Sequence, residues 1–367
     1  MEQNFKVAFC AVLLILAAYF LPEYHATTSE SRETAAKTAE QAARIEMAAV
    51  PPYAALTLLT EPGDGIGAMH DAIARASKSL DLVIYELGDA SIEQDLADAQ
   101  ARGVRVRVIL ENVVSFKKHP NQAAFDFLKA HGVPVEWANK NFALTHQKTL
   151  IIDAGAGGAR ALIMTFNLAP QYYASSRDFA LADSDPVDVA AIEAAFNGDW
   201  NGSIATAAVG GAANGSDLVW SPGSAATLLA LIDSAQGASS TLDVYNEEMA
   251  DARITAALEQ AAARGVRVRV VMSYATAWKS ALNELAAAGV GVRTFASNAK
   301  FYIHAKAIIA DDGTGNARAF VGSENFSVPS LDLNRELGIL IVRPDIITSL
   351  ERTFNRDWIT ARPYSIR

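Results

Sequence analysis

Cysteine is almost absent from this sequence, whose 367 residues include only Cys10. A lone cysteine forms no disulfide within the chain and builds no cysteine-ligated zinc site. The sequence also lacks the His-Glu-x-x-His pattern of zinc hydrolases and the glycine-rich phosphate loop that ends in Lys-Ser or Lys-Thr. We therefore expect a protein that requires no metal ion and no organic cofactor.

Positive charge is also scarce. The 31 lysines and arginines are outnumbered by 41 acidic residues, which gives a net charge of −10. A protein that holds nucleic acid by unspecific phosphate neutralisation is usually basic, so the composition argues against a histone-like or architectural role on DNA. With 51% hydrophobic and 20% charged residues, the chain is neither collagen-like nor disordered.

The N-terminus carries an apolar run that is typical of export. Lys6 precedes fifteen apolar residues, from Val7 to Leu21. Fifteen residues suit the core of a signal peptide, whereas a count of seventeen from Phe5 leaves a short membrane anchor open, since a full span needs about twenty. We predict that residues 1–22 are a signal peptide or an N-terminal anchor and that the rest is exported, either periplasmic or secreted.

One segment of eight residues occurs twice. Ala-Arg-Gly-Val-Arg-Val-Arg-Val stands at 101–108 and again at 263–270, an offset of 162. Each copy follows a helical pattern and enters a strand, and each helix is preceded by an apolar run that contains a carboxylate, at 80–87 and 242–249. Strand, helix, strand at this spacing is typical of a β-α-β unit.

The repeat extends beyond this segment. Residues 143–202 match residues 301–360 without a gap, at an offset of 158. We therefore predict an α/β fold with two tandem homologous halves. The predicted organisation is a polar linker at 23–52, a first half at 53–208, a join rich in glycine and alanine at 209–216 and a second half at 217–367.

A set of polar residues is repeated at the same offset. His146-Gln-Lys148 corresponds to His304-Ala-Lys306, although the chain has only six histidines. A repeated scaffold preserves apolar positions for packing but has less reason to preserve polar residues in register, so we interpret the set as functional. Each His-x-Lys is followed at matching distances by the pairs Asp153 and Asp311, Thr165 and Ser323, Asn167 and Asn325, and Asp178 and Glu336.

The spacing predicts how these residues meet. The apolar runs on either side of residues 154–158 are typical of a hairpin, and a turn centred on Ala156-Gly157 would set His146 opposite Asn167 and Lys148 opposite Thr165. The second copy gives the matching pairs His304 with Asn325 and Lys306 with Ser323.

Each motif also contains an aspartate at an odd distance from its histidine. Asp153 and Asp311 follow their histidines by seven residues, and successive side chains of a strand point to opposite faces. We therefore interpret both aspartates as supports for the strand end and not as bases.

These motifs resemble a known family. His146-x-Lys148-x4-Asp153 and its second copy, with Gly-Ser-Glu-Asn at 322–325, resemble the paired HKD motifs of the phospholipase D superfamily. The resemblance covers about residues 54–360, and Met164 departs from it, because the family usually has glycine before the hydroxyl residue. It implies two halves packed about a pseudo-dyad around one phosphodiesterase site, a covalent phosphohistidine and no metal requirement.

The resemblance also implies a role for each residue. His146 would be the nucleophile and His304 the general acid, while Asp178 and Glu336 would orient the histidines through their other ring nitrogens. Ion pairs with neighbouring basic residues are the alternative for these two acids. The groups expected to stabilise charge on the phosphoryl group are Lys148, Thr165, Asn167, Lys306, Ser323 and Asn325.

The substrate is open at this stage. Phospholipid hydrolysis, or transfer of the phosphatidyl group to an alcohol, suits an exported protein of this superfamily. The alternative is an exported, metal-independent nuclease that cleaves DNA or RNA, because the same superfamily includes nucleases. The intact duplicate motifs argue against a catalytically idle binding module, and nothing implies an obligate protein partner.

Overall fold

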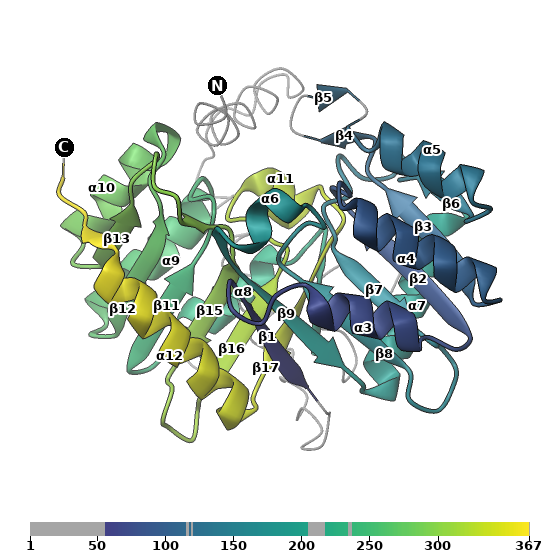
Figure 1. The fold of residues 1–367 in the computed structure, drawn as a ribbon. Coiled ribbons are helices and arrows are strands. Elements are labelled where there is room, and N and C mark those ends of the chain that lie inside the picture. Colours follow the sequence, from purple (N-terminus) through teal and green to yellow (C-terminus); the bar gives the residue numbers. More distant parts are fainter. Residues whose placement is uncertain (1–55, 115–116, 119, 205–216, 234–236, 367) are drawn as a thin grey trace.

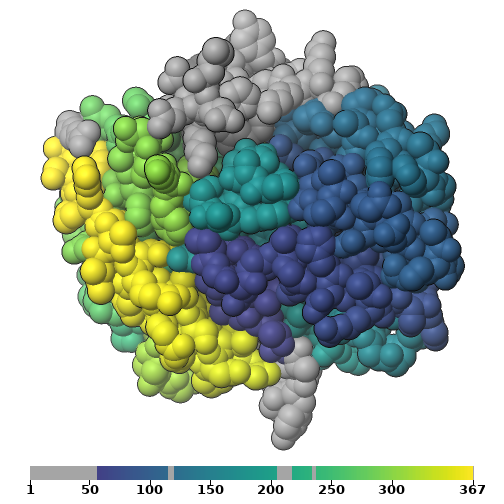
Figure 2. Space-filling model, in the orientation of Figure 1, coloured from purple at the N-terminus to yellow at the C-terminus, as the bar shows by residue number. Residues whose placement is uncertain are grey.

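The computed structural model describes residues 56–114, 117–118, 120–204, 217–233 and 237–366. They form two α/β halves that lie side by side, blue to teal and green to yellow (Figures 1 and 2), and the predicted fold class is confirmed. The predicted signal or anchor, the linker and the join lie outside these residues. Among the residues that are described, no helix has the length and apolar character needed to span a membrane.

Each half is built on one large mixed sheet with the same strand arrangement. The first sheet has the order β1-β9-β8-β7-β2-β3-β6 and the second β10-β17-β16-β15-β11-β12-β13-β18. The strands of the first half are Thr57–Glu61 (β1), Ser79–Ile84 (β2), Arg105–Leu110 (β3), Val135–Trp137 (β6), Thr149–Ile152 (β7), Arg160–Met164 (β8) and Ser176–Asp183 (β9), with a small separate hairpin of Val113–Val114 (β4) and Lys117–Lys118 (β5). Those of the second half are Leu218–Ser221 (β10), Thr241–Tyr245 (β11), Arg267–Ser273 (β12), Gly291–Phe295 (β13), Tyr302–Ile303 (β14), Lys306–Ala310 (β15), Arg318–Gly322 (β16), Glu336–Ile341 (β17) and Arg362–Pro363 (β18).

The helices repeat between the halves as the strands do. The first half contains Gly67–Arg75 (α3), Ala90–Ala101 (α4), Gln122–Ala130 (α5), Pro170–Tyr173 (α6) and Pro186–Trp200 (α7). The second contains Ala225–Asp233 (α8), Ala252–Ala263 (α9), the 3₁₀ turn Thr276–Trp278 (η2), Lys279–Ala287 (α10), Val328–Asp332 (α11) and Pro344–Thr360 (α12). Asp89 and Asp251 cap α4 and α9 by accepting hydrogen bonds from backbone N–H groups of the first turn, and a proline begins α7 and α12.

The duplicated eight-residue segment ends a helix and begins a strand in each half. Gly103 and Gly265 follow α4 and α9 with φ of 91° and 92°, a left-handed conformation that glycine adopts without strain. The valines of β3 and β12 then point into buried cores, with Val106 and Val108 fully buried in the first half. The glycine thus explains why the segment changes from helix to strand at the same point in both copies.

Three apolar cores hold the molecule together. One lies between the first sheet and α3 to α5, and another between the second sheet and α8 to α10. The third joins the halves, because it combines side chains from both sheets with Phe196 of α7 and Phe354 of α12. The halves therefore share a continuous apolar interface, which fixes the position of any site formed between them.

A strand segment of each half crosses to the other half just before its histidine. β14 of the second half pairs in parallel with β9 of the first half, where Ile303 lies level with Arg177. Thr145 of the first half makes the equivalent parallel bridge to Arg335 of the second half. These reciprocal contacts bring each histidine to the start of β9 or β17 in the opposite half.

Two reciprocal ion pairs fix the same crossing. Arg177 of the first half binds Asp357 in α12 through two hydrogen bonds of 2.6 and 3.0 Å. Arg335 of the second half donates to Asp199 in α7 at 2.8 Å. All four side chains are buried, and both arginines stand directly before the predicted acids Asp178 and Glu336.

The register of the two hairpins is one residue away from our prediction. Lys148 lies level with Met164 instead of Thr165, and Lys306 pairs with Gly322, one residue before its predicted partner. The predicted oppositions of His146 to Asn167 and of His304 to Asn325 are displaced in the same way. The histidines precede the regular strands β7 and β15, while Thr165 and Ser323 follow β8 and β16, so the functional residues lie just beyond the paired strand ends.

The turn explains this displacement. We assumed a two-residue turn at the centre, whereas seven residues separate the last strand pairs in each half, at 153–159 and 311–317. Asp153 and Asp311 begin these loops with φ of 53° and 55°, the left-handed region that side chains other than glycine rarely adopt. An odd number of loop residues moves the register by one.

Candidate active site

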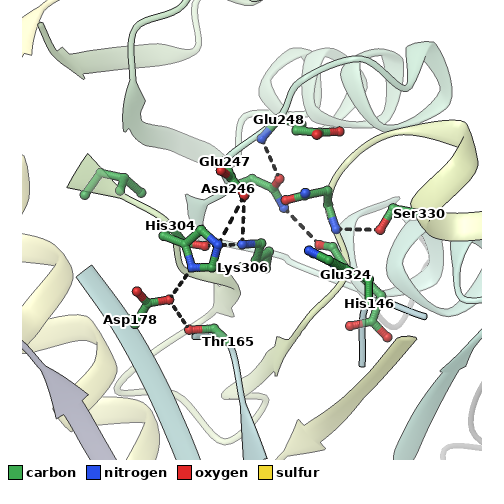
Figure 3. Close-up of polar contacts among 12 residues, drawn as sticks. His146, Thr165, Asp178, Asn246, Glu247, Glu248, His304, Lys306, Glu324 and Ser330 are labelled. Atoms are coloured by element: carbon green, nitrogen blue, oxygen red, sulfur yellow. Dashed lines mark hydrogen bonds and ion pairs between the residues drawn. The ribbon is translucent and has the colours of Figure 1, made fainter. Parts of the chain in front are cut away.

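Each histidine is paired with an acid of the other half. His146 Nδ1 lies 2.9 Å from Glu336 Oε2. His304 Nδ1 lies 2.7 Å from Asp178 Oδ1 (Figure 3). The acids stand at the start of β17 and β9, the strands that the crossing segments contact. Because a carboxylate accepts the Nδ1 proton, each ring is left with Nε2 for chemistry.

Hydroxyl and amide groups hold the two acids in place. Thr165 Oγ1 donates to Asp178 at 2.6 Å and accepts the N–H of Phe179 at 2.9 Å. On the other side, Ser330 Oγ and Asn334 Nδ2 donate to Glu336 at 2.7 and 3.2 Å.

The two hydroxyl residues of the repeated set therefore lie beside the acids. Ser323 Oγ accepts the N–H of Leu337, the residue after Glu336, at 3.1 Å. Thr165 has the matching place beside Asp178. The predicted contact of Thr165 and Ser323 with a phosphoryl group stays a prediction.

The two lysines are fully buried and lie close to the histidines. Lys148 Nζ donates to the carbonyl of His146 at 2.7 Å, and Lys306 Nζ donates to the carbonyl of His304. Both ammonium groups therefore lie next to the ring whose chemistry they are predicted to assist.

Burial favours the neutral forms of His146 and Lys148 in the first half. The pKa of His146 falls to about 4, because the loss of solvent outweighs the attraction of Glu336. Burial and the charge of Lys306 lower the pKa of Lys148 to about 7. Although burial opposes its charge, the neighbouring His146 lowers the pKa of Glu336. His146 is therefore a neutral imidazole at pH 7, with the Nε2 lone pair that a nucleophile requires.

The second half contains a carboxylate that our sequence analysis did not assign to the site. Glu247, two residues beyond β11, accepts from Lys306 Nζ at 3.0 Å and lies 3.5 Å from His304 Nε2 (Figure 3). Tyr302 OH also donates to it at 2.9 Å. The apolar runs at 80–87 and 242–249 each contain a carboxylate, which alone does not distinguish Glu247. It stands out when the two runs are aligned, because the first half has Tyr85 at this position.

Tyr85 gives the first half an aromatic wall. Its ring makes an edge contact with His146, at 4.7 Å between ring centroids, and Lys148 Nζ lies 5.4 Å from its centroid. The equivalent lysine of the second half, Lys306, lies instead against the carboxylate of Glu247.

The two asparagines occupy equivalent places. Asn167 Oδ1 and Asn325 Oδ1 are both buried and have no hydrogen-bond partner among the described residues. Buried polar atoms are usually paired, so equivalent unpaired amides beside two histidines suit groups that bind a ligand.

The aspartates of the two motifs lie at the far ends of their strands. Asp153 accepts the backbone N–H groups of Ser77, Lys78 and Ser79, at 2.6 to 3.0 Å. Asp311 does the same for residues 239–241, at 2.7 to 2.9 Å. Both carboxylates therefore tie the start of β2 or β11 to the end of the next antiparallel strand, and neither contacts a histidine.

The described residues contain no group of three or more histidine, cysteine or acidic side chains arranged to hold a metal ion. The site combines two histidines, two lysines and two asparagines, contributed equally by the halves. Such a set can bind an anion, donate a proton and supply a nucleophile, which are the requirements of phosphoryl transfer.

Comparisons with known proteins agree with this arrangement. A family model described as cardiolipin synthase, PLD-like domain, matches residues 69–200 and 228–358. A mitochondrial cardiolipin hydrolase from Chlamydomonas reinhardtii is 26% identical over 131 residues, which are 36% of this chain and 55% of that protein. The match thus spans about half the length of this curated relative.

Solved structures show the same fold. The crystal structure of phosphatidylserine synthase from Haemophilus influenzae has a TM-score of 0.66 and 11% identity, over 89% of this chain and 92% of that one. Polyphosphate kinase from Porphyromonas gingivalis has a TM-score of 0.63 and 15% identity, over 82% and 46%. At these identities the likeness concerns the fold alone. The two family matches cover most of the chain and fall on the halves that supply the paired histidines, so the chain belongs to the phospholipase D superfamily and carries two PLD-like phosphodiesterase domains.

Proposed function

We propose that the protein is a phospholipase D-type enzyme that hydrolyses phospholipids, or transfers their phosphatidyl group to an alcohol, through a covalent phosphohistidine. The observation that carries this proposal is the pair of reciprocal contacts between His146 and Glu336 and between His304 and Asp178. Neither half holds a complete histidine–acid pair, so the two motifs work as one site.

The first step forms the covalent intermediate. The Nε2 lone pair of neutral His146 attacks phosphorus, the bond from phosphorus to the leaving oxygen breaks, and that oxygen takes the Nε2 proton of His304. Glu336 accepts a hydrogen bond from His146 Nδ1 and stabilises the positive charge that the ring gains. Lys148 and Lys306 stabilise the charge on the phosphoryl oxygens.

The second step reverses these roles. His304, now neutral, removes a proton from water or from an alcohol, whose oxygen attacks phosphorus while the bond to His146 Nε2 breaks. The products are a phosphatidate or a new phosphatidyl ester, and both histidines return to their first protonation states. One histidine therefore serves first as acid and then as base, held throughout by Asp178.

Two observations support a lipid as the substrate. The family model and the curated relative both carry cardiolipin in their descriptions. In addition, α11 follows the Asn325 segment and exposes Val328 and Leu333, with 44% and 42% of their surface accessible. Apolar side chains exposed beside the site suit contact with a lipid surface.

We also propose that the protein acts outside the cytoplasm, as the apolar run at residues 7–21 suggests. Fractionation of cells that express the full chain tests this proposal. Recovery from the periplasm, the medium or the membrane is expected, whereas recovery of the intact chain from the cytosol would contradict it.

The function is tested by assaying the purified protein in parallel on vesicles of phosphatidylcholine, vesicles of cardiolipin and single-stranded DNA, all with excess EDTA. We expect release of the headgroup from a phospholipid, and a loss of at least about 10⁴-fold in His146→Ala. Cleavage of DNA alone would identify a nuclease instead. An activity that EDTA abolishes and zinc restores would contradict the mechanism.

A matched pair of variants tests the lipid surface. Val328→Asp/Leu333→Asp is expected to slow hydrolysis of vesicles about tenfold while leaving hydrolysis of a soluble nitrophenyl phosphodiester unchanged, because both side chains are exposed at the surface. The control Val187→Asp changes an exposed valine at the start of α7 and is expected to leave both activities unchanged.

A further inference from the structure

We propose that Glu247 is a positioning residue that keeps a proton on His304 Nε2 and thereby makes the second half supply the general acid. The inference rests on the proposed function and deepens it, because it explains why two copies of one motif perform different tasks. Glu247 lies outside both motifs, at the end of β11.

His304 lies between two carboxylates. Its Nδ1 is 2.7 Å from Asp178 Oδ1, and its Nε2 is 3.5 Å from Glu247 Oε2. Only the doubly protonated imidazolium can donate from both ring nitrogens. His146, in contrast, meets one carboxylate and the ring edge of Tyr85.

Glu247 is held firmly in this place. It is 3% exposed, and its two oxygens accept from Tyr302 OH and Lys306 Nζ. The preceding residue, Asn246, ties the strand end to the second motif, since its side chain accepts the N–H groups of Glu248 and Phe326 (Figure 3). The carboxylate therefore has a fixed distance to the imidazole.

Glu247 carries charge, unlike Glu248 and Glu324, two other buried glutamates of the second half. Burial raises the pKa of Glu248 to about 8 and that of Glu324 well above its usual value. Although burial also opposes the charge of Glu247, Lys306 and His304 lower its pKa to about 2. A negative charge is thus concentrated beside the Nε2 atom.

Several other titratable groups face this pair. Because their charges also act on His304, a substitution of Glu247 must leave these groups unchanged if its effect on the His304 titration is to be assigned to Glu247. They are Asp178 on β9, Tyr172 on α6, Glu248 after β11, Tyr302 on β14, Lys306 on β15 and, across the site, Lys148 and Glu336.

Glu247 marks the place of the leaving oxygen. In the free enzyme its Oε2 lies 3.5 Å from His304 Nε2. When substrate binds, the leaving oxygen takes the place of this acceptor and receives the proton as its bond to phosphorus breaks. His304 then keeps its Nδ1 proton toward Asp178 and is ready to act as the base of the second step.

The direct test is the titration of His304 in the full chain, followed by NMR of ¹⁵N-labelled histidine side chains and assigned with His304→Asn. Glu247→Gln is expected to move the midpoint for His304 down by about one pH unit, whereas Tyr85→Phe leaves it unchanged. An unchanged midpoint in Glu247→Gln would overturn the proposal. Because this readout needs no substrate, it remains informative if the proposed function fails.

A kinetic test separates positioning from general damage to the site. With an alkyl leaving group, Glu247→Gln is expected to lose about tenfold or more in kcat/KM at pH 8 and to shift the alkaline limb of the pH profile to lower pH. With a nitrophenol leaving group the loss stays below about threefold, because that oxygen departs without a proton. Glu247→Asp restores part of the alkyl activity. An equal loss on both substrates at every pH would contradict the proposal.

Discussion

In the first half the lysine of the His-x-Lys motif lies by an aromatic ring, whereas in the second half the equivalent lysine lies against a carboxylate. The residues responsible, Tyr85 and Glu247, occupy the same position after the second strand of the shared topology. The first half thus holds a neutral imidazole and the second an imidazole between two carboxylates. A duplicated scaffold can assign different tasks to two copies of one motif through a residue outside the motif.

The largest expected effect comes from removing each histidine. His146→Ala should lose at least about 10⁴-fold with any leaving group, because no phosphohistidine forms. His304→Ala should lose about 10²–10⁴-fold with an alkyl leaving group but far less in the first step with nitrophenol. Burst kinetics with both substrates measure the difference. Equal sensitivity of the two variants to the leaving group would remove the distinction between the half-sites.

The next effect concerns the acids that cross between the halves. Glu336→Gln should impair the step that uses His146, and Asp178→Asn the step that uses His304, each by about 10²-fold. A double-mutant cycle measures the pairing of Asp178 with His304. Asp178→Asn should add little to the loss of rate in His304→Ala, but it should have its full effect where His304 is intact. Coupling of Asp178 to His146 instead would show that each half works alone.

A smaller effect separates the two motif aspartates. Asp311 is almost fully buried and Asp153 is half-buried, so Asp311→Asn should cost more stability, about 1–3 kcal/mol, through its weakened bonds to backbone N–H groups. Although burial opposes it, these donors lower the pKa of Asp311 to about 2.

The pH dependence of unfolding provides the check on this pair. A lowered pKa stabilises the fold above about pH 4, and the contribution is lost as the pH falls toward 2. Chemical denaturation between pH 2 and 6 should show a smaller loss in Asp311→Asn than in the wild type. A larger effect of Asp153→Asn would reverse the predicted order.

The last comparison concerns a place where the first half is polar and the second apolar. Asp183 and Asp188 correspond to Ile341 and Ile346, and Asp188 shares hydrogen bonds with Asp183 and with Asp217 of the second half. Burial raises the pKa of Asp183 to about 7 and that of Asp217 to about 9.

The raised pKa values of Asp183 and Asp217 give the stability of the fold a second pH dependence, whose sign is opposite to that caused by Asp311. The folded state keeps protons that the unfolded chain releases near pH 4, so stability is greatest below that pH and is lost as the pH rises toward 9. The slope is at most about 1.4 kcal/mol per pH unit for each proton. In Asp217→Asn, the midpoint of urea unfolding should depend less on pH between 5 and 9 than in the wild type. An unchanged pH dependence would contradict the raised pKa of Asp217.

Much of the fold and of the site could be predicted because the repeat is visible in the sequence. The spacing of His146, Lys148 and Asn167 and of their copies identified the residues that the structure brings together. The exchange of acids between halves could not be predicted, because alignment associates Asp178 with His146. It depends on the crossing of β14 onto β9, a contact between distant segments that carries no local signal.

The hairpin register and the role of Glu247 were missed for different reasons. The register depends on the left-handed conformation of Asp153 and Asp311, which sequence periodicity does not report. Glu247 belongs to no motif. Alignment of the two halves shows that it stands where the first half has Tyr85, but its role follows from its distances to Lys306 and His304.

The account is tested most directly by locating the phosphoryl group on the enzyme during turnover. A phospholipid with ³²P in its phosphodiester is mixed with wild-type protein, quenched within milliseconds, and the labelled peptide is identified by mass spectrometry. We predict that the label lies on the His146 peptide, and that it accumulates in His304→Ala with a nitrophenyl ester. A label on the His304 peptide, or full activity with no label on either, would contradict the account.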